Sequence, residues 1–204
     1  MEECITSKEM ATLDENCKFF GLSTLQLMEN AGSSIAQAIK SRFSGGRIVI
    51  IAGRGNNGGD AFVAARHLRD FDVEVILLGS SGDIRTEEAR KNWKILEEAR
   101  FNLREIRDSS EIDGIRDSLR NADIIIDGIF GTGIRGEIRD PESTVIDLIN
   151  ESKAFVLSVD IPSGVDPDTG SFHKAVNADL TVTFHRMKPG LVKYPNKVEI
   201  ADIG

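Results

Sequence analysis

The chain has 204 residues, of which 40% are hydrophobic and 28% charged, and its formal net charge is −8. This composition is typical of a globular protein and not of a disordered one. The acidic balance argues against general binding to nucleic acids or acidic membranes, whose phosphates require a basic surface. Cys4 and Cys17 form neither a C-x-x-C pair nor a disulfide framework, which favours the cytoplasm. The sequence shows no signal peptide, and no apolar run approaches the roughly 20 residues of a membrane span.

Two helices are expected before the first strand. Ser7 is a candidate N-cap for a helix that runs to about Phe20, with Gly21 as its stop. Ser23 is a candidate N-cap for a second helix over residues 24–43. Apolar residues recur on one face of this second helix at helical spacing: Leu27, Ala31, Ile35, Ala38 and Ile39.

From residue 47 onward, strands and helices alternate. Residues 47–53 are an apolar run rich in β-branched residues, which indicates a strand buried on both faces of a parallel sheet. The pattern predicts further strands at 73–79, 103–106, 122–129, 154–161, 179–184 and 198–201. It predicts helices at 60–70, 86–100, 110–120 and 141–151. The alternation predicts an α/β fold with a doubly wound, mainly parallel sheet and helices on both faces, formed by residues 1–204 as a single domain.

A glycine-rich segment, residues 53–60, follows the first strand and contains a G-x-G-x-x-G motif. Such a segment is either a simple turn or a ligand-binding loop before a helix N-terminus. An ordinary NAD site also has an acidic residue at the end of the second strand, and here that strand ends at Gly79 without one. Asp60 is a helix cap or an anion where pyrophosphate would lie. Asn56 and Asn57 are suited to a metal ion or a neutral ligand group.

Two later strands end in carboxylates. Asp127 interrupts one apolar strand near its carboxyl end, and Asp160 ends the next. Parallel strands bring both to one edge of the sheet, where paired carboxylates bind a cation or act as acid and base. Ser163 adds an oxygen nearby, and the alternative for Asp127 is a hydrogen-bonded structural role. The glycine-rich segment 131–136 is a candidate cradle for phosphate.

The last candidates follow the strand at 179–184. His185 and Lys188 are either surface residues or groups that bind phosphate or move a proton at the same edge. Arg135 is either a further positive charge for phosphate or a solvated loop residue. The histidines and cysteines make no zinc pattern, and the sequence has no G-x-S-x-G elbow and no P-loop lysine motif.

Taken together, these segments resemble the NAD(P)H-hydrate epimerase family, also called the YjeF N-terminal domain family. The matching segments occur in the family's order and span nearly the whole chain: 27–32, 53–60, 127–136, 159–164 and 183–190. One departure is Ala61, where many members have a further glycine.

The resemblance implies a Rossmann-like three-layer α/β/α sandwich that repairs damaged cofactors by interconverting the R and S epimers of hydrated NADH and NADPH at nicotinamide C6. It implies a dehydratase, separate or fused, that uses one epimer, and it is compatible with a homodimer. It also implies a potassium ion held by Asn57, Asp127 and Ser163. The substrate contacts carried over by motif are Asn56, Asn57, Gly58, Gly59, Asp60, Gly131, Thr132, Gly133, Ile134, Arg135, Gly136, Glu137 and Asp160.

Inversion at C6 requires proton transfer to or from oxygen and nitrogen. Asp160 is the first candidate for this acid–base role, with Lys188 or Asp60 as the second. Two other functions are compatible with the fold. The first is a module that binds nucleotides or a protein without catalysis, but such a module gains little from two carboxylates at strand ends. The second is an NAD-dependent oxidoreductase, but that enzyme would need the ribose-binding carboxylate that is missing here.

Overall fold

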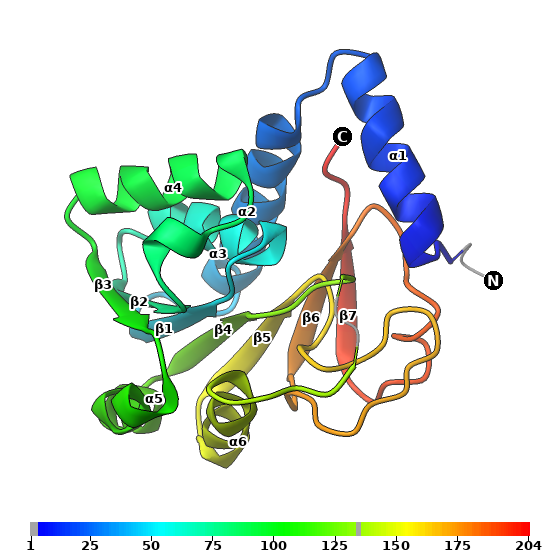
Figure 1. Cartoon of the computed structure of the whole chain (residues 1–204). Coiled ribbons are helices and arrows are strands. Elements are labelled where there is room, and N and C mark those ends of the chain that lie inside the picture. The colour runs from blue at the N-terminus through cyan, green and yellow to red at the C-terminus, as the bar shows by residue number, and fades with distance from the viewer. Residues whose placement is uncertain (1–3, 134–135) are drawn as a thin grey trace.

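The sheet of this protein is wholly parallel. The computed structural model describes residues 4–133 and 136–204. In this part of the chain, seven strands lie in the order β3-β2-β1-β4-β5-β6-β7, and each neighbouring pair is parallel (Figure 1). The strands are β1 (Arg47–Ala52), β2 (Asp72–Leu78), β3 (Asn102–Ile106), β4 (Ile124–Gly128), β5 (Phe155–Val159), β6 (Leu180–Phe184) and β7 (Lys197–Ala201). All of them begin and end within two residues of the predicted positions.

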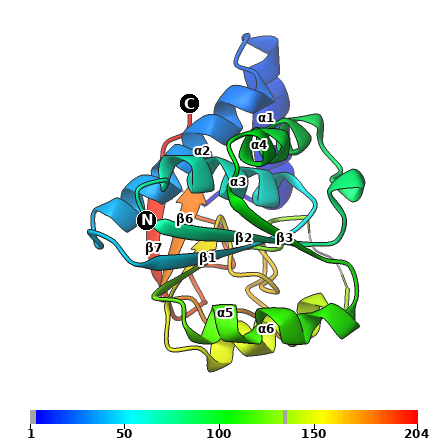
Figure 2. The same ribbon diagram turned by 90° about the vertical axis from the view of Figure 1, so that its left-hand side faces the viewer.

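Helices cover both faces of the sheet, which completes three layers. Helices α2, α3 and α4 lie on one face, and α5 and α6 lie on the other (Figures 1 and 2). The described helices are α1 (Ser7–Phe19), α2 (Thr24–Lys40), α3 (Asn56–His67), α4 (Glu87–Glu98), α5 (Arg116–Arg120) and α6 (Glu142–Glu151), with short 3-10 helices at Ser81–Asp83 and Ser109–Ile115. The prediction of a Rossmann-like α/β/α fold is confirmed.

The hydrophobic core is divided by the sheet because side chains alternate along each strand. Ile48 and Ile50 of β1 pack with the helices of the first face, whereas Val49 and Ile51 pack with those of the second. A third small cluster lies under the loops that follow β5 and β6: Ile161, Val165, Ala175, Leu191 and Tyr194. None of the helices in the described ranges combines the length and apolar character needed to cross a bilayer.

Two helix boundaries near the N-terminus differ from the prediction. The N-cap of α1 is Thr6 and not Ser7, since Thr6 and Glu9 form a reciprocal capping box. Ser23 caps α2 as predicted, but the helix ends at Lys40 and not at residue 43. The predicted helix at 110–120 is also shorter, because its first part is a 3-10 helix and only residues 116–120 are α-helical.

The largest correction concerns the glycine-rich segment. We expected a loop as far as Gly59 and a helix from Asp60, but α3 begins at Asn56 and its N-cap is Gly55. Asp60 is therefore not a helix cap. The structure explains why glycines occupy the first turn of this helix: a Cβ atom on Gly58 would lie 2.0 Å from the Gly53 carbonyl oxygen, and one on Gly59 would lie 2.5 Å from Met28 Cε.

Helix α1 lies at the periphery of the molecule (Figure 1). None of its residues is buried. Its N-terminal end is held by Ser7, whose backbone N–H and hydroxyl donate to the two carboxylate oxygens of Asp168 at 2.8 and 2.6 Å. This attachment places one side of α1 against the edge of the sheet where the candidate site lies.

Candidate active site

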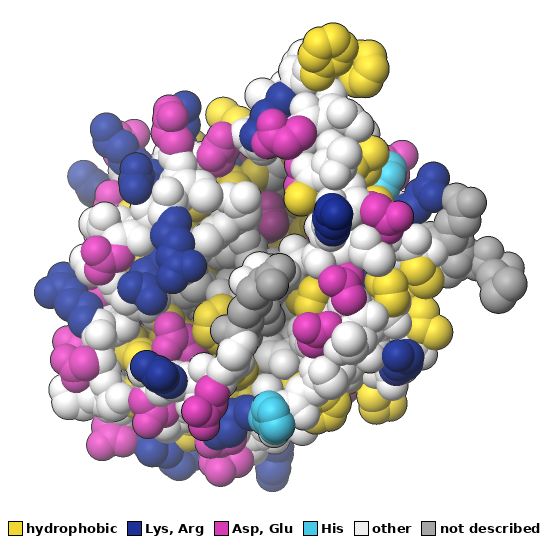
Figure 3. Space-filling model, turned by 45° about the vertical axis from the view of Figure 1, so that its right-hand side comes forward, with side chains coloured by type: hydrophobic (Ala, Val, Ile, Leu, Met, Phe, Trp, Pro, Cys, Tyr) yellow, Lys and Arg dark blue, Asp and Glu magenta, His cyan; other side chains and the backbone are white. Residues whose placement is uncertain are grey.

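A cavity of about 590 Å³ lies beyond the carboxyl ends of the central strands. Gly53 follows β1, Ile129 follows β4 and Asp160 follows β5, and all three line it. This is where ligands bind in open parallel α/β sheets. On the face shown in Figure 3, acidic and basic side chains are interspersed around a central hollow. The cavity is therefore the candidate active site.

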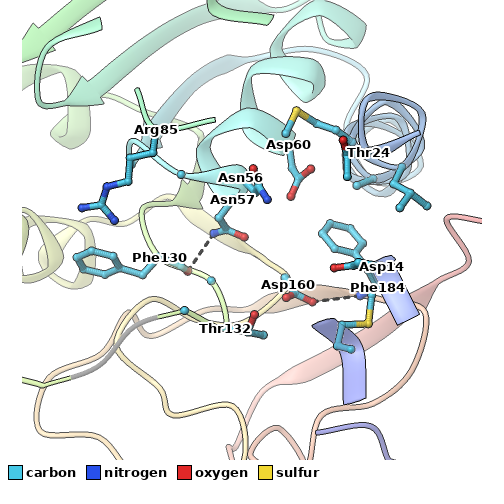
Figure 4. Close-up of a pocket in the computed structure, with 18 of the residues that line it drawn as sticks. Asp14, Thr24, Asn56, Asn57, Asp60, Arg85, Phe130, Thr132, Asp160 and Phe184 are labelled. Carbon is cyan, nitrogen blue, oxygen red and sulfur yellow. Dashed lines mark hydrogen bonds between the residues drawn. The ribbon is translucent and has the colours of Figure 1, made fainter. Parts of the chain in front are cut away.

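The cavity has two chemically different sides. On one side, the carboxyl groups of Asp14, Asp60 and Asp160 point toward the same space (Figure 4). Apolar side chains surround them: Met10, Leu27, Met28, Ala31, Phe184 and Ile203. On the other side lie Arg85, Phe130 and the glycine-rich segments. A ligand that fills the cavity meets carboxyl groups at one end and arginine at the other.

Asp160 is held by residues of β6 and of the loop beyond it. The Lys188 ammonium donates to Asp160 Oδ1 at 2.5 Å, and it also donates to the Phe184 carbonyl at 2.9 Å. The Lys188 side chain has no exposed surface, so its charge requires this carboxylate partner. The Thr183 hydroxyl and the Phe184 N–H also donate to Asp160 Oδ1, at 3.1 and 3.3 Å.

All of these donors use the same oxygen of Asp160. Among the described residues, none donates a hydrogen bond to Oδ2. The side chain remains 13% exposed, and Asp160 lines the cavity. The backbone of Asp160 has a φ of +62°, a strained value for a residue other than glycine. One oxygen is thus fixed by the protein, and the other is available to a ligand.

The surroundings of Asp60 differ from those of Asp160. Within the described ranges, no residue donates a hydrogen bond to its side chain, and it faces Asp160 across the cavity (Figure 4). Burial raises the pKa of Asp60 well above its ordinary value, and the negative charges of Asp160 and Asp14 raise the pKa further. Asp60 therefore retains a proton to higher pH than an ordinary aspartic acid does.

This raised pKa predicts a stabilising substitution. Because the pKa of Asp60 is higher in the folded than in the unfolded state, ionisation of Asp60 disfavours folding at neutral pH. Asp60→Asn should therefore increase the free energy of unfolding at pH 7. The gain should disappear as the pH falls below about 3.8, the ordinary pKa of aspartic acid, where the group is protonated in both states. Urea unfolding of both proteins from pH 3 to pH 8 measures the difference, and a constant difference would contradict this explanation.

Asp127 is the centre of a second polar cluster, which is completely buried. Its Oδ2 accepts from the Ser158 hydroxyl at 2.7 Å and from the Ser163 N–H at 2.9 Å, and its Oδ1 accepts from the Ser163 hydroxyl at 2.5 Å. Burial raises the pKa of Asp127, and the hydrogen bonds from Ser163 and Ser158 oppose this increase. The carboxylate is well satisfied, as its structural interpretation requires.

The Phe130 carbonyl connects this cluster to the cavity. Asn57 Nδ2 donates to it at 2.9 Å, and the Ser163 hydroxyl lies 3.3 Å from it. Asn57, Asp127 and Ser163, the predicted cation ligands, therefore form one connected group. Within the described residues, no cluster of three His, Cys, Asp or Glu side chains is suited to a metal ion. The oxygens of this group come from an amide, a hydroxyl, a carbonyl and a carboxylate, and only the carboxylate carries a charge.

The predicted substrate-binding residues divide into those that line the cavity and those that do not. Those that line the cavity are Asn56, Asn57, Asp60, Gly131, Thr132, Gly133 and Asp160. Gly58 and Gly59 are buried within α3, whereas Gly136 and Glu137 are exposed and do not line the cavity. Ile134 and Arg135 lie outside the described residues. The contacts of all these residues with a substrate stay predictions.

Four charged side chains that line the cavity were not singled out in the sequence, and one of them, Glu142, begins α6. Asp14 comes from α1, a helix with no motif. Arg54 lies inside the G-x-G-x-x-G motif, at a position that the motif leaves open. Arg85 follows β2 in a segment with no recognisable pattern. Only Arg54 carried a usable signal, which is a charged residue within a ligand-binding turn.

Known proteins are similar to this chain in sequence and in fold. The bifunctional NAD(P)H-hydrate repair enzyme Nnr of Archaeoglobus fulgidus is 50% identical over 205 residues, which cover 99% of this chain and 42% of that protein. The NAD(P)H-hydrate epimerase of Cenarchaeum symbiosum is 47% identical over 193 residues, which cover 93% of this chain and 88% of that protein. The crystal structure of yeast ynu0 superposes with a TM-score of 0.85 at 27% identity, covering 97% of this chain and 87% of the yeast chain.

The relatives differ in length. This chain spans less than half of the A. fulgidus repair enzyme but most of the C. symbiosum epimerase. The model of the YjeF-related protein N-terminus matches residues 24–190, which include every residue of the cavity except those of α1 and Ile203. The chain belongs to the YjeF-related protein N-terminus family.

Proposed function

We propose that this chain is an NAD(P)H-hydrate epimerase, an isomerase that interconverts the R and S epimers of hydrated NADH and NADPH at nicotinamide C6. The observation that carries the proposal is the pair of carboxyl groups, Asp60 and Asp160, that face each other in one cavity with different surroundings. The C. symbiosum relative, which matches over most of its length, is named for this activity. The whole-protein activity of the longer relatives includes a further function that we do not assign to these residues.

The chemistry of the substrate explains the need for two carboxyl groups. C6 bears both the ring nitrogen and a hydroxyl, so it has the character of a carbinolamine. In one route, a base removes the hydroxyl proton, the C6–N1 bond breaks to give an aldehyde, and N1 gains a proton. Closure on the opposite face of the aldehyde reverses these transfers and yields the other epimer. In the other route, water leaves C6 and returns on the opposite face. Both routes require one group that accepts a proton and one that donates it.

The surroundings of the two carboxyl groups divide these roles. Asp160 is paired with the Lys188 ammonium through Oδ1, so Oδ2 is free to accept a proton from the substrate hydroxyl. Asp60, whose pKa is raised by burial, is suited to donate a proton. Lys188 does not line the cavity, so it acts through Asp160 as a positioning residue. This role differs from the direct acid–base role for which Lys188 was a second candidate.

We include a bound potassium ion in the proposal, with Asn57, Asp127 and Ser163 as its side-chain ligands. The donor set fits, because a hard cation prefers oxygen ligands of the kinds that these residues and the Phe130 carbonyl provide. Asp127, the one carboxylate of this donor set, matches the single charge of the ion. When bound, the ion would supply positive charge next to Asn57 and Phe130, which line the cavity.

Potassium is expected to stabilise the protein and to increase its activity. The melting temperature should rise with potassium concentration more than with sodium at the same ionic strength, because a ligand of the folded state stabilises it. Asn57→Ala and Ser163→Ala should remove this difference. Ser171→Ala, a change in an exposed serine away from the cluster, should retain it. Equal melting curves for the wild-type protein in both salts would exclude the ion.

A coupled assay tests the epimerase activity. A dehydratase that uses one epimer consumes only part of a mixture of R and S hydrates within the time of the assay. Addition of this protein should allow the dehydratase to consume the whole mixture, because the unused epimer is converted continuously. If the unused epimer persists at its spontaneous rate of decline, the proposal is wrong. A separate or fused dehydratase is the functional partner that we propose; the predicted homodimer and cytoplasmic location stay predictions.

A further inference from the structure

The arginine side of the cavity has no role in the chemistry described above. Arg54 and Arg85 both line the cavity, and Arg85 lies across it from Asp14 and Asp160 (Figure 4). The two residues are linked through the backbone, since the Arg85 N–H donates to the Arg54 carbonyl at 2.8 Å. Arg54 follows β1, and Arg85 follows the 3-10 helix after β2. The sheet edge thus brings two arginine residues to one end of the cavity.

Arg54 lies across the carboxyl end of β2. A Cβ atom on Gly79, the residue after this strand, would lie 2.5 Å from Arg54 Cδ and 3.1 Å from Nε. Gly79 has a φ of +124°, a conformation that favours glycine. In dinucleotide sites, an acidic residue at the carboxyl end of the second strand binds the ribose 2′-hydroxyl, whereas an arginine nearby accommodates a 2′-phosphate. In this protein, Arg54 lies at the carboxyl end of the second strand.

No carboxylate in the described part of the chain neutralises these two arginines through an ion pair. Glu105, on the neighbouring strand β3, is engaged by Arg107 and by the Ser81 N–H. Glu142 lines the same cavity but forms no ion pair with either arginine. In a chain whose net charge is −8, two arginines that line one side of a cavity are suited to an anionic group of a ligand.

We propose that Arg54 and Arg85 bind the 2′-phosphate of hydrated NADPH, so that the enzyme prefers hydrated NADPH to hydrated NADH. This inference rests on the proposed function. The nicotinamide end of the substrate then lies at Asp60 and Asp160, on the opposite side of the cavity. The pyrophosphate lies between the two ends, at the N-terminus of α3 and the Gly131–Gly133 segment.

Kinetics with the two hydrates test the preference. The wild-type protein should have the higher kcat/KM for hydrated NADPH. Arg85→Ala and Arg54→Ala should each lower that value about 10-fold, the effect of losing a hydrogen bond to a charged group. Both should change kcat/KM for hydrated NADH less than about twofold. Arg116→Ala, which removes an exposed arginine paired with Asp113, is the charge-matched control and should change neither value. Equal losses for both hydrates would assign the arginines to the pyrophosphate and overturn the proposal.

Binding without catalysis separates this inference from the proposed function. Calorimetry with adenosine 2′,5′-bisphosphate and with 5′-AMP compares ligands that differ only in the 2′-phosphate. The bisphosphate should bind about 10-fold more tightly, and Arg85→Ala should abolish the difference. This result would support the phosphate site even if the chain fails to epimerise hydrates. Equal affinity of the wild-type protein for both ligands would overturn the site, whatever the outcome of the activity assay.

Discussion

Asp160→Asn is expected to lower the rate of epimerisation by about 10²- to 10⁴-fold, the range typical of a lost general acid–base group. Asparagine preserves the size of the side chain and an oxygen for the donors at Oδ1, but it cannot accept the proton. The value of kcat should fall much more than the affinity for the substrate, because the arginine side of the cavity is unchanged. Turnover of a single hydrate epimer measures kcat and KM separately.

The loss of the Asp160 charge also affects Lys188. This ammonium group is completely buried, and breaking a buried ion pair by removing one partner destabilises a protein by about 3–5 kcal/mol. Asp160→Asn combined with Lys188→Met removes both charges and should recover much of the stability while the activity stays low. If the double variant regains normal activity together with its stability, Asp160 is a structural residue and the assignment is wrong.

Gly58→Ala is expected to destabilise the fold strongly, although alanine favours helices over glycine by about 1 kcal/mol. The new Cβ atom would lie 2.0 Å from the Gly53 carbonyl oxygen and 2.9 Å from its carbon. Both atoms belong to the backbone, which cannot move aside as a flexible side chain can. Overpacking of this kind costs about 1–3 kcal/mol and occasionally more. Urea unfolding gives the change in the free energy of unfolding.

Gly133→Ala is the matched control for this substitution. Apart from its chain neighbours, no described residue has an atom within 4 Å of a Cβ atom placed on Gly133, and the residue belongs to the second glycine-rich segment of the same cavity. Its unfolding midpoint should remain close to that of the wild-type protein. If both variants unfold at the same urea concentration, close backbone contact is not the reason for Gly58.

The strands were predictable because the parallel sheet imposes a simple pattern. A strand buried on both faces is continuously apolar, so β1, β4 and β5 are visible as runs of Ile and Val. Asp127 and Asp160 stand out because each follows or interrupts such a run. In the structure both lie at the same edge of the sheet, but only Asp160 lines the cavity, whereas Asp127 is buried with Ser158 and Ser163.

The start of α3 was not predictable from local preference. Two Asn and two Gly residues disfavour a helix, and the turn is helical because Gly58 and Gly59 permit close contact with Gly53 and Met28. That contact depends on tertiary packing, which no local pattern contains. The 3-10 helix before α5 escaped prediction because a spacing of three residues and one of four are hard to distinguish over a short segment.

The contacts that the site residues make with distant residues also could not be predicted from the sequence. Lys188 was a candidate, but nothing in its position indicates that it is buried against Asp160, 28 residues earlier. Asp14 joins the cavity because contacts such as that of Ser7 with Asp168 hold α1 beside the sheet edge. The segment of Arg85 is held beside the cavity by a backbone hydrogen bond to Arg54. Each of these neighbours depends on contacts between distant segments.

The most direct test of the account begins with one pure epimer of hydrated NADPH. Chromatography follows the appearance of the other epimer with the wild-type protein, with the Asp160→Asn Lys188→Met variant and with no protein, in potassium buffer. We predict that the wild-type protein brings the two epimers to equilibrium far faster than the spontaneous reaction, and that the variant does not. Appearance of the second epimer at the spontaneous rate with folded wild-type protein would contradict the account.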